Sequence, residues 1–179
     1  MNPAPDTRYA ILLRGVNVGG ITVRMAELRA VLESLGFADV RTLLASGNAV
    51  VTAGFNPAEL KAQTEQALRR EFGYEAWVIV LPVSRVAELA GAVPYPADDP
   101  AVHAYVTFAS DPAVLDELFD IGAAAGARQV RLGPEAVAWT VQKGSSLDSP
   151  LSKATAKPRY KSSTTTRNLR TLHKIAAVE

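Results

Sequence analysis

The chain has 179 residues, of which 48% are hydrophobic and 21% charged, with a formal net charge of +1. This composition is typical of an ordinary globular protein and argues against a disordered chain. The sequence contains no cysteine, which excludes disulfides, thiolate metal sites and a cysteine nucleophile.

The first half of the chain alternates strand and helix patterns. RYAILLRG (8–15) predicts a strand covered on both faces, because aliphatic side chains stand at both odd and even positions and would therefore point to both faces of a sheet. A helix is predicted over 25–36, with one apolar stripe and a terminal glycine. DVRTLLA and NAVVTA predict a hairpin with a tight turn between them. A second helix opens with Asn-Pro, runs over about 56–73 and precedes the strand EAWVIVL.

This order is the βαββαβ plan of a ferredoxin-like domain, which we assign to residues 1–92. A proline-rich acidic linker is predicted at 93–100. Residues 101–148 repeat the plan up to a third strand, which predicts a second ferredoxin-like half that is incomplete. Residues 149–179 are predicted to be a basic C-terminal segment that ends in a helix. The predicted fold class is therefore α+β, with two ferredoxin-like halves in tandem, the second incomplete and closed by the C-terminal helix.

The glycine-bearing stretch GVNVGG (15–20) predicts the functional site. In a split βαβ sheet the loop after the first strand and the hairpin between the second and third share an edge, so GVNVGG is expected to face SGN (46–48). Glycine amides near a helix start favour an anion, and arginine can grip a phosphate with two hydrogen bonds. The alternative is that the glycines only permit turns and the asparagines bond their own backbones. The candidate ligand-binding residues are Arg14, Asn17, Gly19, Gly20, Ser46 and Asn48, with Arg167 and Asn168 from the C-terminal segment.

The C-terminal segment carries an excess of positive charge. Residues 149–179 hold seven basic residues against one acidic residue, whereas residues 1–148 hold 12 basic and 17 acidic residues. Thr165 or Thr166 is expected to cap the last helix, which would put Arg167 in the first turn, where a cation opposes the helix dipole.

Three interpretations of this segment stay open. In the first, the segment docks on the acidic body of its own chain or stays solvated, with its last helix as an amphipathic docking or oligomerising helix. In the second, it contacts the anion bound at the site above. In the third, it binds a nucleic-acid backbone through the residues from Lys153 to Lys174. The leading hypothesis is a protein that binds a small anionic or phosphorylated ligand. The alternative is a nucleic-acid-binding accessory protein.

Several other sites are set aside. His103 and His173 lie far apart without metal-ligand spacing, so neither a metal nor a cofactor is expected. No nucleophile elbow accompanies the serines, and NAVVTA lacks the stacking aromatics of an RNA-recognition module. Trp77 and Trp139 are assigned to the core. Without a secretory signal or a long apolar run, a cytoplasmic location with no membrane partner is expected. The sequence is compatible with a binding protein and with an enzyme. It does not indicate an oligomeric state.

Three segments together carry a resemblance to a known family. YAILLRGVNVGG with MAELRAVLESLGF, VRTLLASGNAVV, and TTTRNLRTLHKI are similar to the motifs of the family known as domain of unknown function 1697 (DUF1697). The family's lysine-rich link before the first helix is replaced here by ITVR. The resemblance implies a duplicated ferredoxin-like α+β fold and no established activity. The matching positions are Leu13, Arg14, Gly15, Asn17, Val18, Gly19, Gly20, Ser46, Gly47, Asn48, Thr166, Arg167, Asn168, Thr171 and Lys174.

Overall fold

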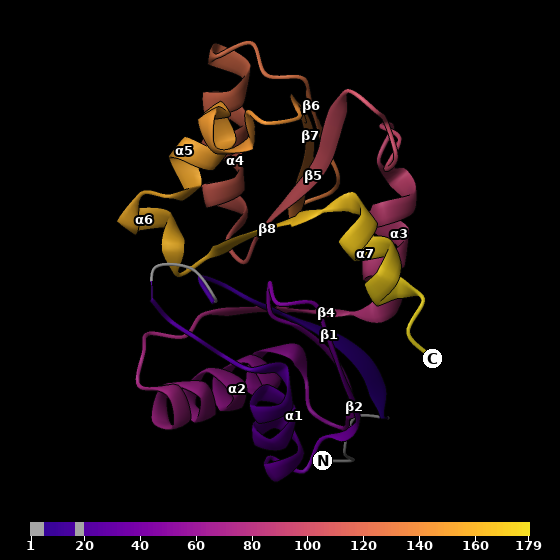
Figure 1. The fold of residues 1–179 in the computed structure, drawn as a ribbon, viewed down its shortest axis with the longest axis vertical. Coiled ribbons are helices and arrows are strands. Elements are labelled where there is room, and N and C mark those ends of the chain that lie inside the picture. Colours follow the sequence, from indigo (N-terminus) through magenta and orange to yellow (C-terminus); the bar gives the residue numbers. More distant parts are fainter. Residues whose placement is uncertain (1–5, 17–19) are drawn as a thin grey trace. The chain divides into compact units, whose positions relative to one another are not determined.

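The structure, a computed structural model, describes residues 6–16 and 20–179. The chain divides into two compact units. The first unit comprises Met1–Val86 and Ile175–Glu179, and the second comprises Ala87–Lys174. Each unit contributes one four-stranded antiparallel sheet with its own helices (Figure 1). The expected α+β class with tandem ferredoxin-like halves is thereby confirmed.

The first sheet has the predicted ferredoxin-like topology. Its strand order is β2-β3-β1-β4, with β1 central and antiparallel to both β3 and β4. The third strand therefore lies between the first two, as the split βαβ plan requires. The elements of this half are β1 (Thr7–Leu13), α1 (Met25–Ser34), β2 (Ala38–Leu43), β3 (Asn48–Ala53), α2 (Pro57–Phe72) and β4 (Val78–Pro82).

Local sequence signals fix the ends of α2. The Asn56 side chain accepts a hydrogen bond from the Glu59 amide at 2.9 Å, and the Glu59 carboxylate accepts one from the Asn56 amide at 3.2 Å. This reciprocal pair is a capping box, which satisfies two otherwise unpaired amides at the helix start. At the other end Gly73 has φ +66°, the left-handed conformation that commonly ends a helix.

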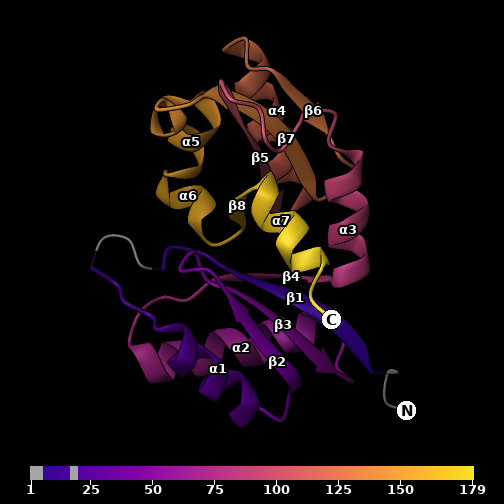
Figure 2. The same ribbon diagram turned by 45° about the vertical axis from the view of Figure 1, so that its right-hand side comes forward.

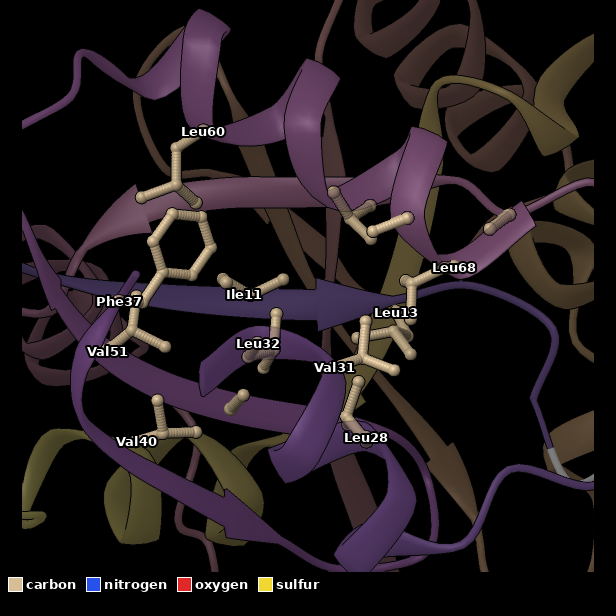
Figure 3. Close-up of a cluster of buried hydrophobic side chains, with 14 of the residues drawn as sticks. Ile11, Leu13, Leu28, Val31, Leu32, Phe37, Val40, Val51, Leu60 and Leu68 are labelled. Atoms are coloured by element: carbon tan, nitrogen blue, oxygen red, sulfur yellow. The ribbon is translucent and has the colours of Figure 1, made fainter. Parts of the chain in front are cut away.

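Helices α1 and α2 cover the same face of the first sheet (Figure 2). Between the helices and the sheet lies a core of aliphatic side chains with Phe37 among them (Figure 3). β1 contributes Ile11 and Leu13 to this core, while Ala10 and Leu12, on the other side of the pleat, are also fully buried. Side chains on both faces of β1 are therefore buried, which confirms the pattern expected from the sequence.

The second sheet is complete, which corrects the expectation of an incomplete half. Its order β6-β7-β5-β8 repeats that of the first sheet, and Thr164–Asn168 supplies the fourth strand. β-branched threonines favour this extended pairing, in which Arg167 lies opposite Val106 of β5. Pro158 begins a new short helix, so two short helices replace the single second helix of the plan. The elements are β5 (Val102–Ala109), α4 (Pro112–Ala124), β6 (Gln129–Arg131), β7 (Ala136–Gln142), the 3-10 turn η1 (Ser146–Asp148), α5 (Pro150–Thr155), α6 (Pro158–Lys161) and β8 (Thr164–Asn168).

The second unit has a core of its own. Leu115 and Leu118 of α4 pack with Trp139 of β7, Leu151 of α5 and Tyr160 of α6. Two further helices follow the last strands of the two sheets, α3 (Val83–Ala92) after β4 and α7 (Leu169–Ala176) after β8. Within residues 6–16 and 20–179, we find no helix with the length and apolar character needed to cross a bilayer.

Candidate functional site

The end of β1 and the β2–β3 turn are in direct contact. The Leu13 amide donates a hydrogen bond to the Gly47 carbonyl at 2.8 Å. Gly47 has φ +83°, and a Cβ added to it would lie 2.5 Å from Val16 Cγ2 and 2.9 Å from Leu13 Cβ. A glycine is therefore required for the turn to approach this closely. The first residues after β1 and the SGN turn thus share one edge of the sheet.

Arg14 lies at this edge and is half-buried. Its amide donates to the Trp77 carbonyl at 2.9 Å, which continues the β1–β4 ladder one residue beyond Leu13 and Val78. Because Leu13 faces the helices, the alternation of the strand places Arg14 on the opposite face of the sheet. Burial lowers the pKa of Arg14, since desolvation disfavours the charged guanidinium.

The Asn48 side chain stabilises the β2–β3 turn through hydrogen bonds. It is fully buried, and its side-chain amide donates to the Leu43 carbonyl at 3.0 Å and to the Ser46 hydroxyl at 2.9 Å. These bonds are the turn-forming role that asparagine commonly takes. Ser46 itself is exposed at the turn. Asn48 therefore orients the Ser46 hydroxyl, which lies at the surface.

The glycine loop is described only in part. Gly20 is exposed with φ +89°, and no described atom lies within 4 Å of the position of an added Cβ. Asn17 and Gly19, which the sequence also proposed as ligand-binding residues, lie outside the described residues. Helix α1 begins at Met25, and the preceding Arg24 makes no capping hydrogen bond within the described part of the chain.

Arg167 and Asn168 are strand residues of the second unit, which corrects the expected helical position of Arg167. Helix α7 begins at Leu169, and the Asn168 side chain accepts a hydrogen bond from the Arg170 amide at 2.9 Å. The buried Arg167 guanidinium donates to the Thr165 hydroxyl at 2.7 Å and to the Thr166 carbonyl at 3.0 Å. Arg167 therefore does not oppose the dipole of α7. The site described here is built from residues of the first unit, and the ligand-binding roles expected for Arg167 and Asn168 stay a prediction.

The basic C-terminal segment is folded into the second unit. Arg159 of α6 forms an ion pair with Glu117 at 2.7 Å, and the Tyr160 hydroxyl donates to the same carboxylate at 2.9 Å. Lys157 and Lys161 at the two ends of α6 are exposed and form no ion pair with any described residue. On the apolar side of α7, Leu169, Leu172 and Ile175 are buried.

The two tryptophans differ in their surroundings. Trp139 is only 2% exposed, as expected for a core residue, and its indole donates to the Thr107 hydroxyl at 2.9 Å. Trp77 is half-buried instead, and the Arg69 guanidinium lies 4.5 Å from its ring centroid. The sequence carried no signal for this difference, because Trp77 lies within the uninterrupted apolar run of residues 76–81.

Metal-ligating side chains do not gather in the described regions. Across residues 6–16 and 20–179, we find no group of three or more His, Asp or Glu side chains that could hold a metal ion. The chemistry that the site offers is that of a guanidinium and a hydroxyl, which are hydrogen-bond donors suited to an anion.

The fold and this site define a protein of two ferredoxin-like halves with a donor-rich edge on the first sheet. The chain belongs to the family of proteins of unknown function DUF1697, whose model matches residues 7–137. Its fold is similar to the solved structure of the conserved bacterial protein SP0830 from Streptococcus pneumoniae, with a TM-score of 0.74 and 24% sequence identity over 96% of this chain and 97% of that chain. No curated protein matches the sequence.

Proposed function

We propose that the protein binds a small anionic or phosphorylated ligand at the edge of the first sheet where β1 meets the β2–β3 turn. The observation that carries this proposal is the half-burial of Arg14 at that edge. An arginine guanidinium binds phosphate and carboxylate groups through charge-assisted, often bidentate hydrogen bonds, so its presence at this edge supports an anionic ligand. We also propose that the protein is located in the cytoplasm.

The neighbouring groups support an anion at this position. The Ser46 hydroxyl is exposed and held by Asn48, so its orientation is set before a ligand arrives. Gly20 leaves the backbone open to close approach by a ligand. In this arrangement Arg14 supplies the charge and Ser46 supplies a neutral hydrogen bond.

The test measures phosphate binding with a matched arginine control. Arg8 lies near the start of β1, whereas Arg14 directly follows the end of that strand. Inorganic phosphate and ribose 5-phosphate are titrated by calorimetry into the wild type, Arg14→Ala and Arg8→Ala. We expect binding to the wild type and Arg8→Ala and a loss of about tenfold or more in Arg14→Ala. Equal affinities in Arg14→Ala and Arg8→Ala would refute the proposal.

A second candidate function is binding to a nucleic-acid backbone through the second unit. It is supported by Lys157 and Lys161, whose exposed charges are not paired with a described carboxylate. Phosphate contacts release counterions, so the affinity should fall steeply with salt concentration. Fluorescence anisotropy with a labelled RNA in a salt series tests this candidate. The double variant Lys157→Gln/Lys161→Gln should reduce the salt slope, and a slope that stays the same would exclude these two residues as the contact.

A further inference from the structure

We propose that three side chains of α2 cover the outer edge of β4 and prevent it from pairing with β4 of a second copy of the chain. These side chains, the edge cluster, are Lys61, Glu65 and Arg69, which lie four residues apart on α2. Residues with this spacing share one face of a helix. The inference involves no residue of the candidate anion site and does not depend on that proposal.

The outer edge of β4 carries peptide groups that a further strand could use. Among the described strands, β4 stands at the end of the first sheet and pairs with β1 alone. The Arg14 amide donates to the Trp77 carbonyl, so the peptide groups of Trp77 point toward β1. Because this direction alternates along a strand, the groups of Ala76 and Val78 point away from β1. Peptide groups exposed in this way are a template for pairing with another chain.

The edge cluster binds these outward peptide groups. The Val78 amide donates to the Glu65 carboxylate at 3.0 Å, and the Lys61 ammonium donates to the Val78 carbonyl. One turn further along α2, the Arg69 guanidinium donates to the Ala76 carbonyl at 3.0 Å. One donor and two acceptors that an added strand would need are therefore already satisfied by side chains of the same chain.

The edge cluster is held together and lies between β4 and solvent. Glu65 Oε1 accepts a hydrogen bond from Lys61 Nζ, and Glu65 Oε2 lies 3.7 Å from Arg69 Nη2. The Arg69 guanidinium also lies 4.5 Å from the Trp77 ring centroid. The side chains of Lys61 and Arg69 are 29% and 41% exposed, whereas Val78 beneath them is 1% exposed. Removing the cluster would therefore expose the outward peptide groups of Val78 to solvent.

The sequence of this strand indicates which partner the exposed edge would take. Residues 76–81, AWVIVL, are all apolar and contain no proline, glycine or charge. Segments of this kind pair readily with copies of themselves. Two β4 strands that pair antiparallel about a two-fold axis would join two first sheets into one. A second copy of the chain is therefore the partner that the edge cluster excludes.

The opposite edge of the first sheet is protected in a different way. The register between β2 and β3 shifts between Ala38 and Arg41, and Asp39 has φ +49°. A β-bulge of this kind interrupts the regular row of peptide groups and hinders pairing at an edge. Both edges of the sheet thus carry a feature that opposes the addition of a strand, and at β4 this feature is the edge cluster.

The test removes the edge cluster and measures self-association. Sedimentation velocity over a concentration series compares the wild type, Lys61→Ala/Glu65→Ala and the control Arg70→Ala/Glu71→Ala. The control removes one positive and one negative charge from exposed positions of the same helix, and alanine favours the helix in both variants. We expect Lys61→Ala/Glu65→Ala to self-associate at least about tenfold more strongly than the wild type, because it leaves the peptide groups of Val78 without partners. The control should behave as the wild type does.

Hydrogen exchange followed by NMR locates the contact. In dilute Lys61→Ala/Glu65→Ala the Val78 amide should exchange faster than in the wild type, and it should become protected again when the variant associates. Adding Val80→Pro should prevent this association, because alternation directs the Val80 amide away from β1, so the proline removes a donor of the outer edge and no bond to β1.

Two results would overturn the inference. One is equal self-association of Lys61→Ala/Glu65→Ala and its control, and the other is an association that leaves the Val78 amide unprotected. If Lys61→Ala/Glu65→Ala does not fold, Lys61→Ala is compared with Arg70→Ala, since it frees the Val78 carbonyl and leaves Glu65 on the Val78 amide. Lys61→Ala should then self-associate more strongly than Arg70→Ala, and equal association of these two variants would also overturn the inference.

Discussion

Replacing Gly47 with alanine tests the contact between the β2–β3 turn and the end of β1. The added Cβ would lie 2.5 Å from Val16 Cγ2 and 2.9 Å from Leu13 Cβ. The left-handed conformation alone costs an alanine about 1–2 kcal/mol, and forcing a methyl group against packed neighbours costs about 1–3 kcal/mol more. Leu13 Cβ cannot withdraw, because it is attached directly to the backbone of β1. The expected loss of about 2–5 kcal/mol is large against the marginal stability of a domain.

Gly36→Ala is the matched control. Gly36 has the same φ of +83°, but no described atom lies within 4 Å of the position of its added Cβ. This variant should therefore lose only the conformational cost of about 1–2 kcal/mol. Urea unfolding followed by far-UV circular dichroism, and by Trp77 emission in a Trp139→Phe background, measures both variants. If Gly47→Ala is no less stable than Gly36→Ala, the turn does not pack on β1 and the geometry of the candidate site is wrong.

Three further predictions follow from single side chains. Asn48→Asp puts an acceptor where the amide donates to Leu43, so we expect a loss of about 1–3 kcal/mol in urea unfolding that shrinks at low pH, where the new carboxyl is protonated. Glu65→Gln weakens the side-chain acceptor of an amide of β4, and thermal unfolding should show a lower midpoint; an unchanged midpoint would contradict this role. The hydrogen bond to Glu117 raises the pKa of Tyr160, which favours the protonated hydroxyl in the folded state. Stability should therefore fall as pH rises above about 10, and Tyr160→Phe should lose less stability over that range, which urea unfolding across alkaline pH checks.

The sequence predicted the elements whose signals are local. The two-sided apolar pattern of β1 and the capping box at Asn56 and Glu59 depend on neighbouring residues, and the structure has both. The contact between the first loop and the SGN turn also followed from the order of elements, because that order defines the edge that they share. The fold class and the contact between the end of β1 and the β2–β3 turn were therefore accessible without coordinates.

Contacts between distant residues decided the rest. TTTRN was interpreted as the start of a helix because threonine is a common helix cap, but pairing with β5, some sixty residues earlier, made it a strand. Trp77 and Asn48 likewise acquired their environments from cross-strand neighbours. The free energy of strand pairing and burial depends on partners that are remote in the sequence, and local propensity is too weak to determine it. The sequence alone thus determined the order of elements, and the tertiary structure decided which side chains form the candidate site.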